Sequence, residues 1–394
     1  MSDLRRPSLH RHGTKHYVVR SVLASQPGRE VCVEAMDESV PQQLSVPSRP
    51  FTGTIVSTPA EILDLTAFVS SLAAEPGMLA PRFFLASVLP RYWKPCVVVV
   101  SQRRRIAGLL YCKERIVAGV GTRIAFGDDT LGTMVAAHPE ETESVIQCAV
   151  EALLKHMVAL RFRVPADRFA FLESAMTNAD IHFRRVEHHA HLELPPTYDE
   201  FLAKVGPHTR RNLRYYRRRS ELTGNEFCPD QPFSDFCVAA RRLFPKEAYA
   251  TRKSNLQRCL AMIEAMPTRL LVGLRRRGGE WISLAGGWHV GGRAVLDLQL
   301  NDRTRSRESV SLVLRSYLIE QLINRRIREL VFRGGTSAPL SFYTAHREEF
   351  MAYVDSPSQP WRLVRRACVT LTKLAPVTFG RLLKWVVPDG DQAN

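Results

Sequence analysis

The chain has 394 residues, which exceeds one comfortable hydrophobic core, so two domains or a tandem repeat are expected. With 45% hydrophobic and 24% charged residues, the composition is that of a globular protein and excludes a largely disordered one. The formal charge of +16 favours a phosphate-bearing ligand, a nucleic acid or an anionic membrane surface, and does not distinguish among them. The eight cysteines include no C-x-x-C pair, which favours reduced thiols over a disulfide framework or a zinc site.

Residues 1–55 are expected to form a basic N-terminal extension, because they are polar and interrupted by prolines. The first twenty residues lack the apolar core of a secretory signal. No later run approaches the roughly 20 apolar residues of a membrane-spanning helix. We therefore expect a cytoplasmic protein, with at most peripheral contact to the inner face of the membrane.

A first module is predicted over residues 56–200. Its apolar residues follow helical spacing in two segments and form short β-branched runs in four others. The predicted helices span 59–75 and 140–160, and the predicted strands span 96–102, 106–119, 161–164 and 189–195. The basic turn at 103–105 makes the first two strands a hairpin, and the run PCVVVV reads as a buried strand.

The same order of elements returns in a second module, predicted over residues 231–358. Residues 269–302 contain three strand-like runs separated by Gly-Gly turns, and 308–326 has helical spacing. A short strand at 328–335 and a second helix at 339–350 complete it. No letter-level repeat is visible, so the expected symmetry is architectural. The fold class is therefore α/β, with two mixed, mostly antiparallel sheets flanked by helices.

Between the modules, residues 201–230 are predicted to form a basic linking helix. In the stretch KVGPHTRRNLRYYRRRSEL, seven of nineteen residues are Lys or Arg and one is acidic. Helical spacing groups four of these cations on one face, namely Arg210, Arg214, Arg217 and Arg218. This face is either a binding site for an anionic substrate or a solvated linker surface. A nucleic acid is the weaker alternative, because no aromatic ladder or RNA-binding signature accompanies the charge.

The passage from TRRNLR through WISLAGGWHV and LNDRTRSRESVSLVLRSYLIEQLI to LVFRGGTSAPLSFY resembles the GNAT-like acyltransferases of cellulose or exopolysaccharide biosynthesis. These proteins are tandem GNAT-like modules, similar in plan to the Fem-type transferases of peptidoglycan assembly. The resemblance covers roughly residues 95–355, and the order of its motifs is more specific than any one of them. It implies acetyl-CoA or another acyl-CoA as co-substrate, without a metal.

In that family a glycine-containing loop before the helix binds the pyrophosphate of coenzyme A, whereas this chain has no glycine between Asp302 and Val310. A loop that leads into a helix N-terminus still offers free N–H groups to phosphate. We expect the missing glycines to be replaced by cations and a cap, namely Arg303, Arg305, Arg307 and Ser309. An exposed polar loop is the alternative.

Acyl transfer needs a base for the nucleophile and an acid for the departing thiolate. The resemblance places Asp302 at the end of its strand as the base and Tyr343 as the acid. For each residue taken singly, a structural role, as a cap or a packed aromatic, is favoured over catalysis. The expected acceptor is an amino or hydroxyl group of an envelope or exopolysaccharide sugar, or of its phosphorylated lipid-linked precursor.

The C-terminal segment, 359–394, is basic and amphipathic, with six Lys or Arg and no acid over 360–387. It is either an interfacial helix attracted to anionic lipid or a helix docked on the second module. Two other functions stay open. One is a Fem-type transferase that uses aminoacyl-tRNA, and the other is a non-enzymatic GNAT-like scaffold that binds nucleic acid or membrane.

Overall fold

The computed structural model describes residues 51–72, 77–127, 134–165, 180–244, 250–333, 336, 340–356 and 358–374. The chain divides into two compact units, Arg49–Val364 and a second one made of Met1–Ser48 with Arg365–Asn394. Only residues 365–374 of the second unit are described. The expected N-terminal extension therefore lies outside the described residues up to residue 50, and the C-terminal segment lies outside them from residue 375.

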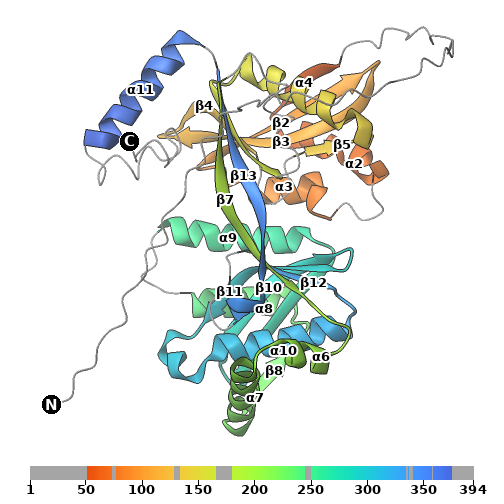
Figure 1. The fold of residues 1–394 in the computed structure, drawn as a ribbon, viewed down its shortest axis with the longest axis vertical. Coiled ribbons are helices and arrows are strands. Elements are labelled where there is room, and N and C mark those ends of the chain that lie inside the picture. The colour runs from red at the N-terminus through yellow and green to blue at the C-terminus, as the bar shows by residue number, and fades with distance from the viewer. Residues whose placement is uncertain are drawn as a thin grey trace, which may run out of the picture. The chain divides into compact units, whose positions relative to one another are not determined.

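The first half of Arg49–Val364 contains the predicted hairpin and the predicted long helix (Figure 1). Its elements are β1 (Thr52–Val56), α1 (Pro59–Asp64), α2 (Thr66–Leu72), η1 (Gly77–Leu79), α3 (Pro81–Ser87), β2 (Trp93–Gln102), β3 (Arg105–Val117), β4 (Val120–Gly127), β5 (Met134–Ala136), η2 (Pro139–Glu141), α4 (Thr142–Leu154), β6 (Ala159–Pro165) and β7 (Asp180–Glu193). The helix predicted over 59–75 is two helices. The Thr66 hydroxyl binds the Leu63 carbonyl at their junction, which ends the first helix.

The second half contains the three predicted strands of 269–302 and the predicted helix of 308–326. Its elements are α6 (Tyr198–Lys204), α7 (Pro207–Leu222), β8 (Asn225–Cys228), α8 (Phe233–Leu243), α9 (Ala250–Ala265), β9 (Arg269–Arg276), β10 (Trp281–Val290), β11 (Arg293–Asn301), η4 (Arg303–Glu308), α10 (Val310–Asn324), β12 (Glu329–Phe332), η5 (Leu340–Tyr343), β13 (Ala345–Asp355) and α11 (Gln359–Leu374). The order of strands, helix and strand thus occurs twice.

The strands form one hydrogen-bonded path in the order β1-β2-β3-β4-β6-β13-β7-β12-β11-β10-β9-β8, with β5 beside β3. Two neighbouring pairs are parallel, β4 with β6 and β11 with β12, and the other pairs are antiparallel. A parallel pair needs a crossover connection, and here α4 and α10 provide it. The expected mixed, mostly antiparallel sheets with flanking helices are confirmed.

The two halves exchange strands at the middle of this path. The end of β7, from the first half, pairs with β12 of the second half. Conversely, β13 comes from the end of the second half and pairs with β6 of the first half along the whole length of β6. The strands β7 and β13 also pair with each other and run side by side (Figure 1). Each half is therefore completed by a strand from the other.

The second helix predicted over 339–350 is wrong. Residues Leu340–Tyr343 form one 3₁₀ turn, and β13 follows at once. The segment EFMAYVD contains a continuous apolar run typical of a buried strand, with Ala352 and Val354 in the core of the first half. Pairing with β6 on one side and β7 on the other satisfies the backbone of β13, which outweighs the helical tendency of Glu348, Glu349 and Met351.

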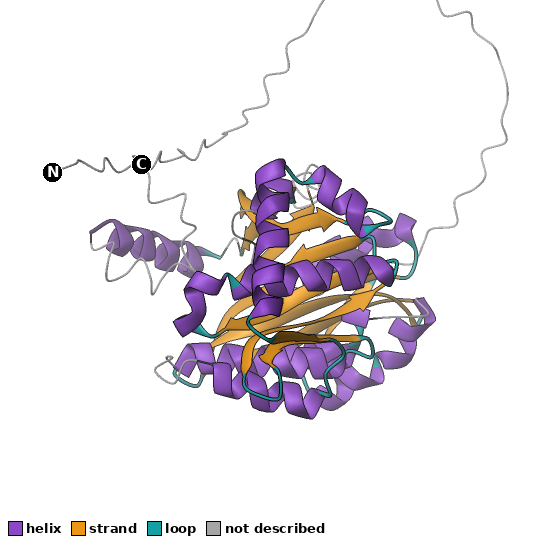
Figure 2. Cartoon of the chain, turned by 90° about the horizontal axis from the view of Figure 1, so that it is seen from below, coloured by secondary structure: helices purple, strands orange, loops and turns teal. Residues whose placement is uncertain are grey.

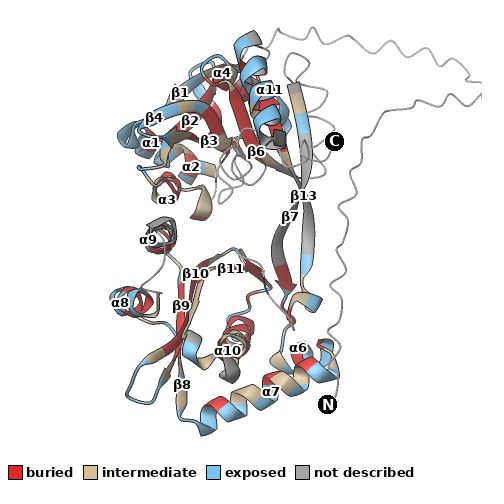
Figure 3. Ribbon diagram, turned by 90° about the vertical axis from the view of Figure 1, so that its left-hand side faces the viewer, coloured by how far each residue is buried: buried red, intermediate tan, exposed pale blue. Residues whose placement is uncertain are grey.

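Helices cover both faces of the strands (Figure 2). In the second half, α10 packs on one face of the sheet through a buried apolar set that includes Val313, Leu314, Leu318 and Ile319. On the other face, α8 and α9 bury Phe236, Met262 and Ile263. Figure 3 shows these buried residues between the sheet and the helices, with exposed residues on the outer side of α7.

Candidate active site

A β-bulge interrupts β11 in the second half. Gly286 of β10 pairs with Leu298 and Gly287 pairs with Leu296, so Asp297 is an extra residue on β11. A Cβ atom at Gly287 would lie 1.8 Å from the carbonyl oxygen of Val295, so only glycine fits there. The glycine pair 286–287 thus lies inside β10, opposite the bulge.

The pairing between β11 and β12 ends at this bulge. Their last paired residues are Leu296 and Phe332, and the N–H of Arg333 still donates to the Leu296 carbonyl at 3.1 Å. Residues 297–301 of β11 continue beyond β12, which ends at Phe332. Peptide groups that lose a strand partner need another one, so this edge can accept an extended, amide-bearing ligand.

A buried ion pair lies at the bulge. Nη1 of Arg333 is 2.6 Å from Oδ1 of Asp297, and their side chains are 14% and 4% exposed. Among the described residues, no N–H or O–H group donates to Oδ2 of Asp297. Burial and the charge of Asp297 raise the pKa of the nearby Cys259 thiol to about 12. Asp297 is therefore a buried carboxylate that Arg333 holds through Oδ1, with the Cys259 thiol as a further hydrogen-bond partner.

A second polar group lies beside the α10 face of β11. Gln299 donates to the Ser311 hydroxyl at 2.9 Å and accepts from Nε of Arg315 at 2.8 Å. Arg315 also donates to the Thr336 hydroxyl and lies over the Phe332 ring. No carboxylate of the described residues pairs with Arg315, and burial lowers its pKa to about 10. A half-buried cation with neutral partners favours the approach of an anion.

Sequence reasoning missed these residues, namely Asp297, Gln299, Ser311, Arg315, Arg333 and Thr336. One signal was present in the strand LDLQLND, where two polar residues stand among leucines. Alternation alone assigns such residues to a solvated face. Instead, the side chain of Asp297 is buried at the bulge and Gln299 is half-buried beside α10.

Asp302, predicted as the base, is held in a tight turn after β11. Its Oδ1 accepts hydrogen bonds from the N–H and the hydroxyl of Thr304 at 2.9 and 2.7 Å. Its Oδ2 lies 3.3 Å from Nε of Arg305. The Thr304 hydroxyl, the Thr304 N–H and the charge of Arg305 lower the pKa of Asp302. A lowered pKa makes a carboxylate a weaker proton acceptor, so this geometry disfavours Asp302 as the base.

The predicted phosphate loop is the 3₁₀ segment η4. Arg305 is bound by two carboxylates, Asp302 and Glu308, the latter at 3.1 Å. The side chains of Arg303 and Arg307 lie outside the described residues. Ser309 is the N-cap of α10 in a left-handed conformation with φ 50°, and its side chain makes no capping hydrogen bond. The family glycine is absent, yet Ser309 adopts a backbone conformation that glycine favours.

The change Ser309→Gly is expected to raise the free energy of unfolding by about 0.5–1 kcal/mol. A left-handed residue with a Cβ costs about 1–2 kcal/mol, partly offset by the greater freedom of glycine when unfolded. Urea denaturation measures the difference. Ser311→Gly, inside α10, is the matched control and should lower stability instead. A loss of stability for Ser309→Gly would contradict the strained backbone.

Tyr343, predicted as the acid, lies at the N-terminus of α7. Its hydroxyl accepts a hydrogen bond from the Gly206 N–H at 2.7 Å and donates one to the Thr209 hydroxyl at 3.3 Å. These two hydrogen bonds lower the pKa of Tyr343. No hydrogen bond among the described residues joins Tyr343 to Asp302. Tyr343 thus binds the first turn of the basic helix, and its role as an acid stays a prediction.

The change Tyr343→Phe is expected to lower the free energy of unfolding by about 1 kcal/mol, because the Gly206 N–H loses its partner. If the hydroxyl also protonates a thiolate, turnover falls roughly 10²-fold while donor binding is kept. Denaturation and steady-state kinetics measure the two effects separately. A stability loss with unchanged turnover would limit Tyr343 to capping α7.

The basic helix α7 packs on α10 rather than standing as a free linker. Leu213 is buried, and Arg217 lies 2.8 Å from Glu320 and stacks 4.0 Å from the Tyr317 ring centre. The expectation that four arginines share one open face is therefore wrong for Arg217, because its spacing from Leu213 turns it toward α10. Arg214 and Arg218 are exposed, and Arg210 is half-buried.

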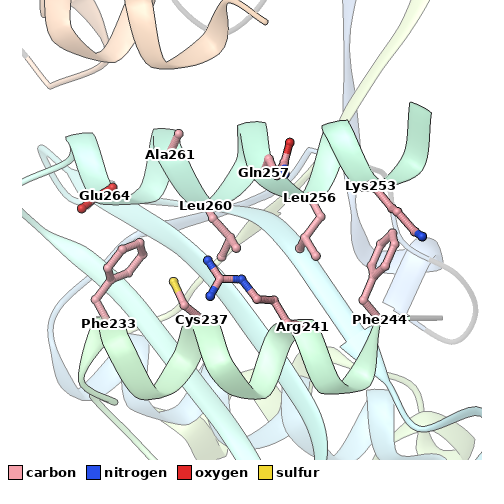
Figure 4. A pocket seen from close by; sticks show the side chains of 10 residues that line it. All are labelled: Phe233, Cys237, Arg241, Phe244, Lys253, Leu256, Gln257, Leu260, Ala261 and Glu264. Atoms are coloured by element: carbon pink, nitrogen blue, oxygen red, sulfur yellow. The ribbon is translucent and has the colours of Figure 1, made fainter. Parts of the chain in front are cut away.

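An open groove of about 580 Å³ separates α8 from α9 (Figure 4). Its apolar side chains include Leu256 and Leu260 of α9, with Cys237 of α8 facing them. Lys253 lies toward one end and Glu264 toward the other, while the guanidinium of Arg241 lies in the middle beside Cys237. The groove thus combines apolar side chains with two cations and one carboxylate.

Solved structures share this architecture of mixed strands flanked by helices. FemX has a similar fold, with 10% identity over 79% of this chain and 99% of that chain and a TM-score of 0.53. So does the C-terminal domain of a predicted lysylphosphatidylglycerol synthetase from Agrobacterium fabrum, with 12% identity over 75% and 92% and a TM-score of 0.51. A conserved protein of unknown function from Bacteroides thetaiotaomicron has 14% identity over 76% and 97% and a TM-score of 0.52.

No protein-family model and no curated protein matches the chain. Identities of 10–14% establish a shared fold and nothing finer. The predicted fold class, two tandem GNAT-like modules, is confirmed.

Proposed function

We propose that this protein is a GNAT-type acyltransferase whose second module, residues 231–358, is catalytic. The donor is acetyl-CoA or another acyl-CoA, and the acceptor is an amino or hydroxyl group on an envelope or exopolysaccharide sugar or its lipid-linked precursor. The observation that supports this most strongly is the bulge at Asp297, located where β11 leaves β12. The resemblance to GNAT-like acyltransferases and the shared fold point to the same reaction class.

The donor fits the edge that β11 exposes. The arm of coenzyme A contains amide groups, which can pair with residues 297–301 as an added strand would. The free N–H groups in the first turn of α10 and the half-buried cation Arg315 favour the phosphates. Because Arg305 is paired with Asp302 and Glu308, we assign Arg315 the larger share of this attraction.

In the proposed reaction, the acceptor nitrogen or oxygen attacks the thioester carbon, the carbon–sulfur bond breaks, and the thiolate takes up a proton. Asp297 is the proposed base for the acceptor, and Arg333 fixes its Oδ1. Asp302 remains the alternative base and Tyr343 the proposed acid. The backbone N–H groups beside the bulge are candidates to stabilise the negative oxygen of the intermediate.

The groove between α8 and α9 suits an amphipathic acceptor. Leu256 and Leu260 can contact an aliphatic portion, and Arg241 with Lys253 can bind a phosphate. The exposed arginines of α7, Arg214 and Arg218, and the half-buried Arg210 form a second anionic-substrate surface. Both features favour a phosphorylated, lipid-linked sugar over an uncharged one.

An aminoacyl-tRNA donor is the second candidate. It is favoured by the exposed face of α7, where Arg211, Arg214 and Arg218 surround Tyr215, which is 56% exposed. Phosphate contacts of this kind produce affinity that falls steeply with salt. The shared fold with FemX is compatible with either donor.

Thermal-shift and calorimetric titrations with acetyl-CoA, coenzyme A and aminoacyl-tRNA test the donor. We expect a rise in Tm with acetyl-CoA, because a ligand that binds only the folded state stabilises it. Arg315→Met should weaken this binding at least tenfold, whereas Arg325→Met, at the far end of α10, should not. Stabilisation by aminoacyl-tRNA alone would replace the first candidate by the second, and no response to either would refute both.

A further inference from the structure

The helix α11 is fixed to the sheet at its first turn. Trp361 is 8% exposed, and its Nε1 donates to Oδ1 of Asp355 at 3.1 Å. The same oxygen accepts from Nη2 of Arg161 at 2.8 Å, inside the pairing of β6 with β13. A buried charged group thus defines where the helix begins and which side faces the sheet.

Beyond this turn, α11 presents large apolar side chains to solvent. Leu363 is 62% exposed, Val364 is 49% exposed and Leu371 is 41% exposed. At 100° per residue they lie within one stripe of the helix, with the exposed Ala367 between them. Single exposed leucines are ordinary, but a continuous apolar stripe indicates an interaction surface.

The charge beside this stripe has one sign. Residues 359–374 include four basic residues and no acid, and the chain adds two more basic residues and no acid up to residue 387. Arg366, which lies one helical turn after Leu363, is exposed. An anionic lipid bilayer has negatively charged headgroups above a hydrocarbon layer. An apolar stripe beside cations complements such a surface.

We propose that α11 docks the protein on an anionic membrane surface, lying in the plane of the interface with Leu363, Val364 and Leu371 inserted. None of the described helices is both long enough and apolar enough to cross a bilayer. The docking goes beyond the transfer reaction and does not depend on it. It would deliver the protein to the surface where a lipid-linked acceptor resides.

Co-sedimentation of the full chain with vesicles tests the proposal. One set contains phosphatidylcholine only, and the other contains 30% phosphatidylglycerol. We expect at least tenfold stronger partitioning to the anionic set, and a marked loss of binding in 0.5 M salt. The double variant Leu363→Ser with Leu371→Ser should weaken partitioning at least tenfold, because both side chains lose their apolar transfer energy.

Matched variants on α7 serve as controls. Leu222 is 79% exposed and Arg219 is exposed, so Leu222→Ser and Arg219→Glu make similar changes elsewhere. These variants should bind anionic vesicles as the wild type does, whereas Arg366→Glu should bind them more weakly than the wild type. Equal binding by the wild type and the α11 double variant, or equal binding to both vesicle sets, would overturn the proposal. So would a wild-type dimer that the double variant converts to a monomer without any vesicle binding.

Discussion

The change Gly287→Ala is expected to destabilise the protein by about 4 kcal/mol or more, a large part of the stability of an ordinary domain. The added Cβ would lie 1.8 Å from the Val295 carbonyl oxygen and 3.2 Å from Cα of Leu296, while ordinary contact begins near 3.4 Å. These are backbone atoms, so no side-chain rotation can relieve the overlap. The strands β10 and β11 would have to separate at the bulge.

Thermal unfolding and chemical denaturation measure this loss. The matched control is Gly279→Ala, in the turn between β9 and β10. An added Cβ there meets nothing closer than 3.5 Å, and its φ is not positive. We expect the control to stay within about 0.5 kcal/mol of the wild type. Similar stability for both variants would show that the bulge at Asp297 is not formed.

The change Asp297→Asn is expected to lower turnover by roughly 10²-fold or more, with donor affinity changed much less. Asparagine keeps the shape and an acceptor for Arg333 but removes the charge that would draw a proton from the acceptor substrate. Removing one charge of a buried pair also weakens the fold, by up to about 3–5 kcal/mol. Turnover is therefore compared at a temperature where circular dichroism shows a folded variant.

Two companion variants separate chemistry from folding. Asp302→Asn removes the other candidate base from a partly exposed turn, and its turnover should fall less than that of Asp297→Asn. Arg333→Lys keeps a positive charge beside Asp297 and should retain more activity than Asp297→Asn. If Asp302→Asn instead abolishes turnover while Asp297→Asn retains it, the base is Asp302 and the bulge only shapes the site.

Local patterns were enough to predict several elements of the fold. The β-branched runs at 96–102 and 106–119 are β2 and β3, because two apolar runs joined by a short basic turn pair with each other. The helical spacing over 308–326 is α10, whose buried stripe covers the sheet. The architectural repeat followed from the order of these elements alone.

The candidate site could be predicted less well. The sequence pointed to the loop after β11, but the structure pairs Arg305 with Asp302 and Glu308 instead of leaving it open. The polar groups at the bulge come from β11, α9, α10 and the residues after β12, which lie far apart in the chain. No local pattern links Asp297 to Arg333 or Gln299 to Arg315.

By itself, the sequence determined several of the helices and strands, the repeat in their order, and the strongly basic charge of the chain. These properties depend on neighbours a few residues apart, where periodicity and turn residues act directly. Only the tertiary structure decided that 345–355 is a strand, that β7 and β13 are exchanged between halves, and that Asp297 is buried beside Arg333. The physical reason is that strand pairing and ion pairing are contacts between distant residues, and their free energy can override a local preference.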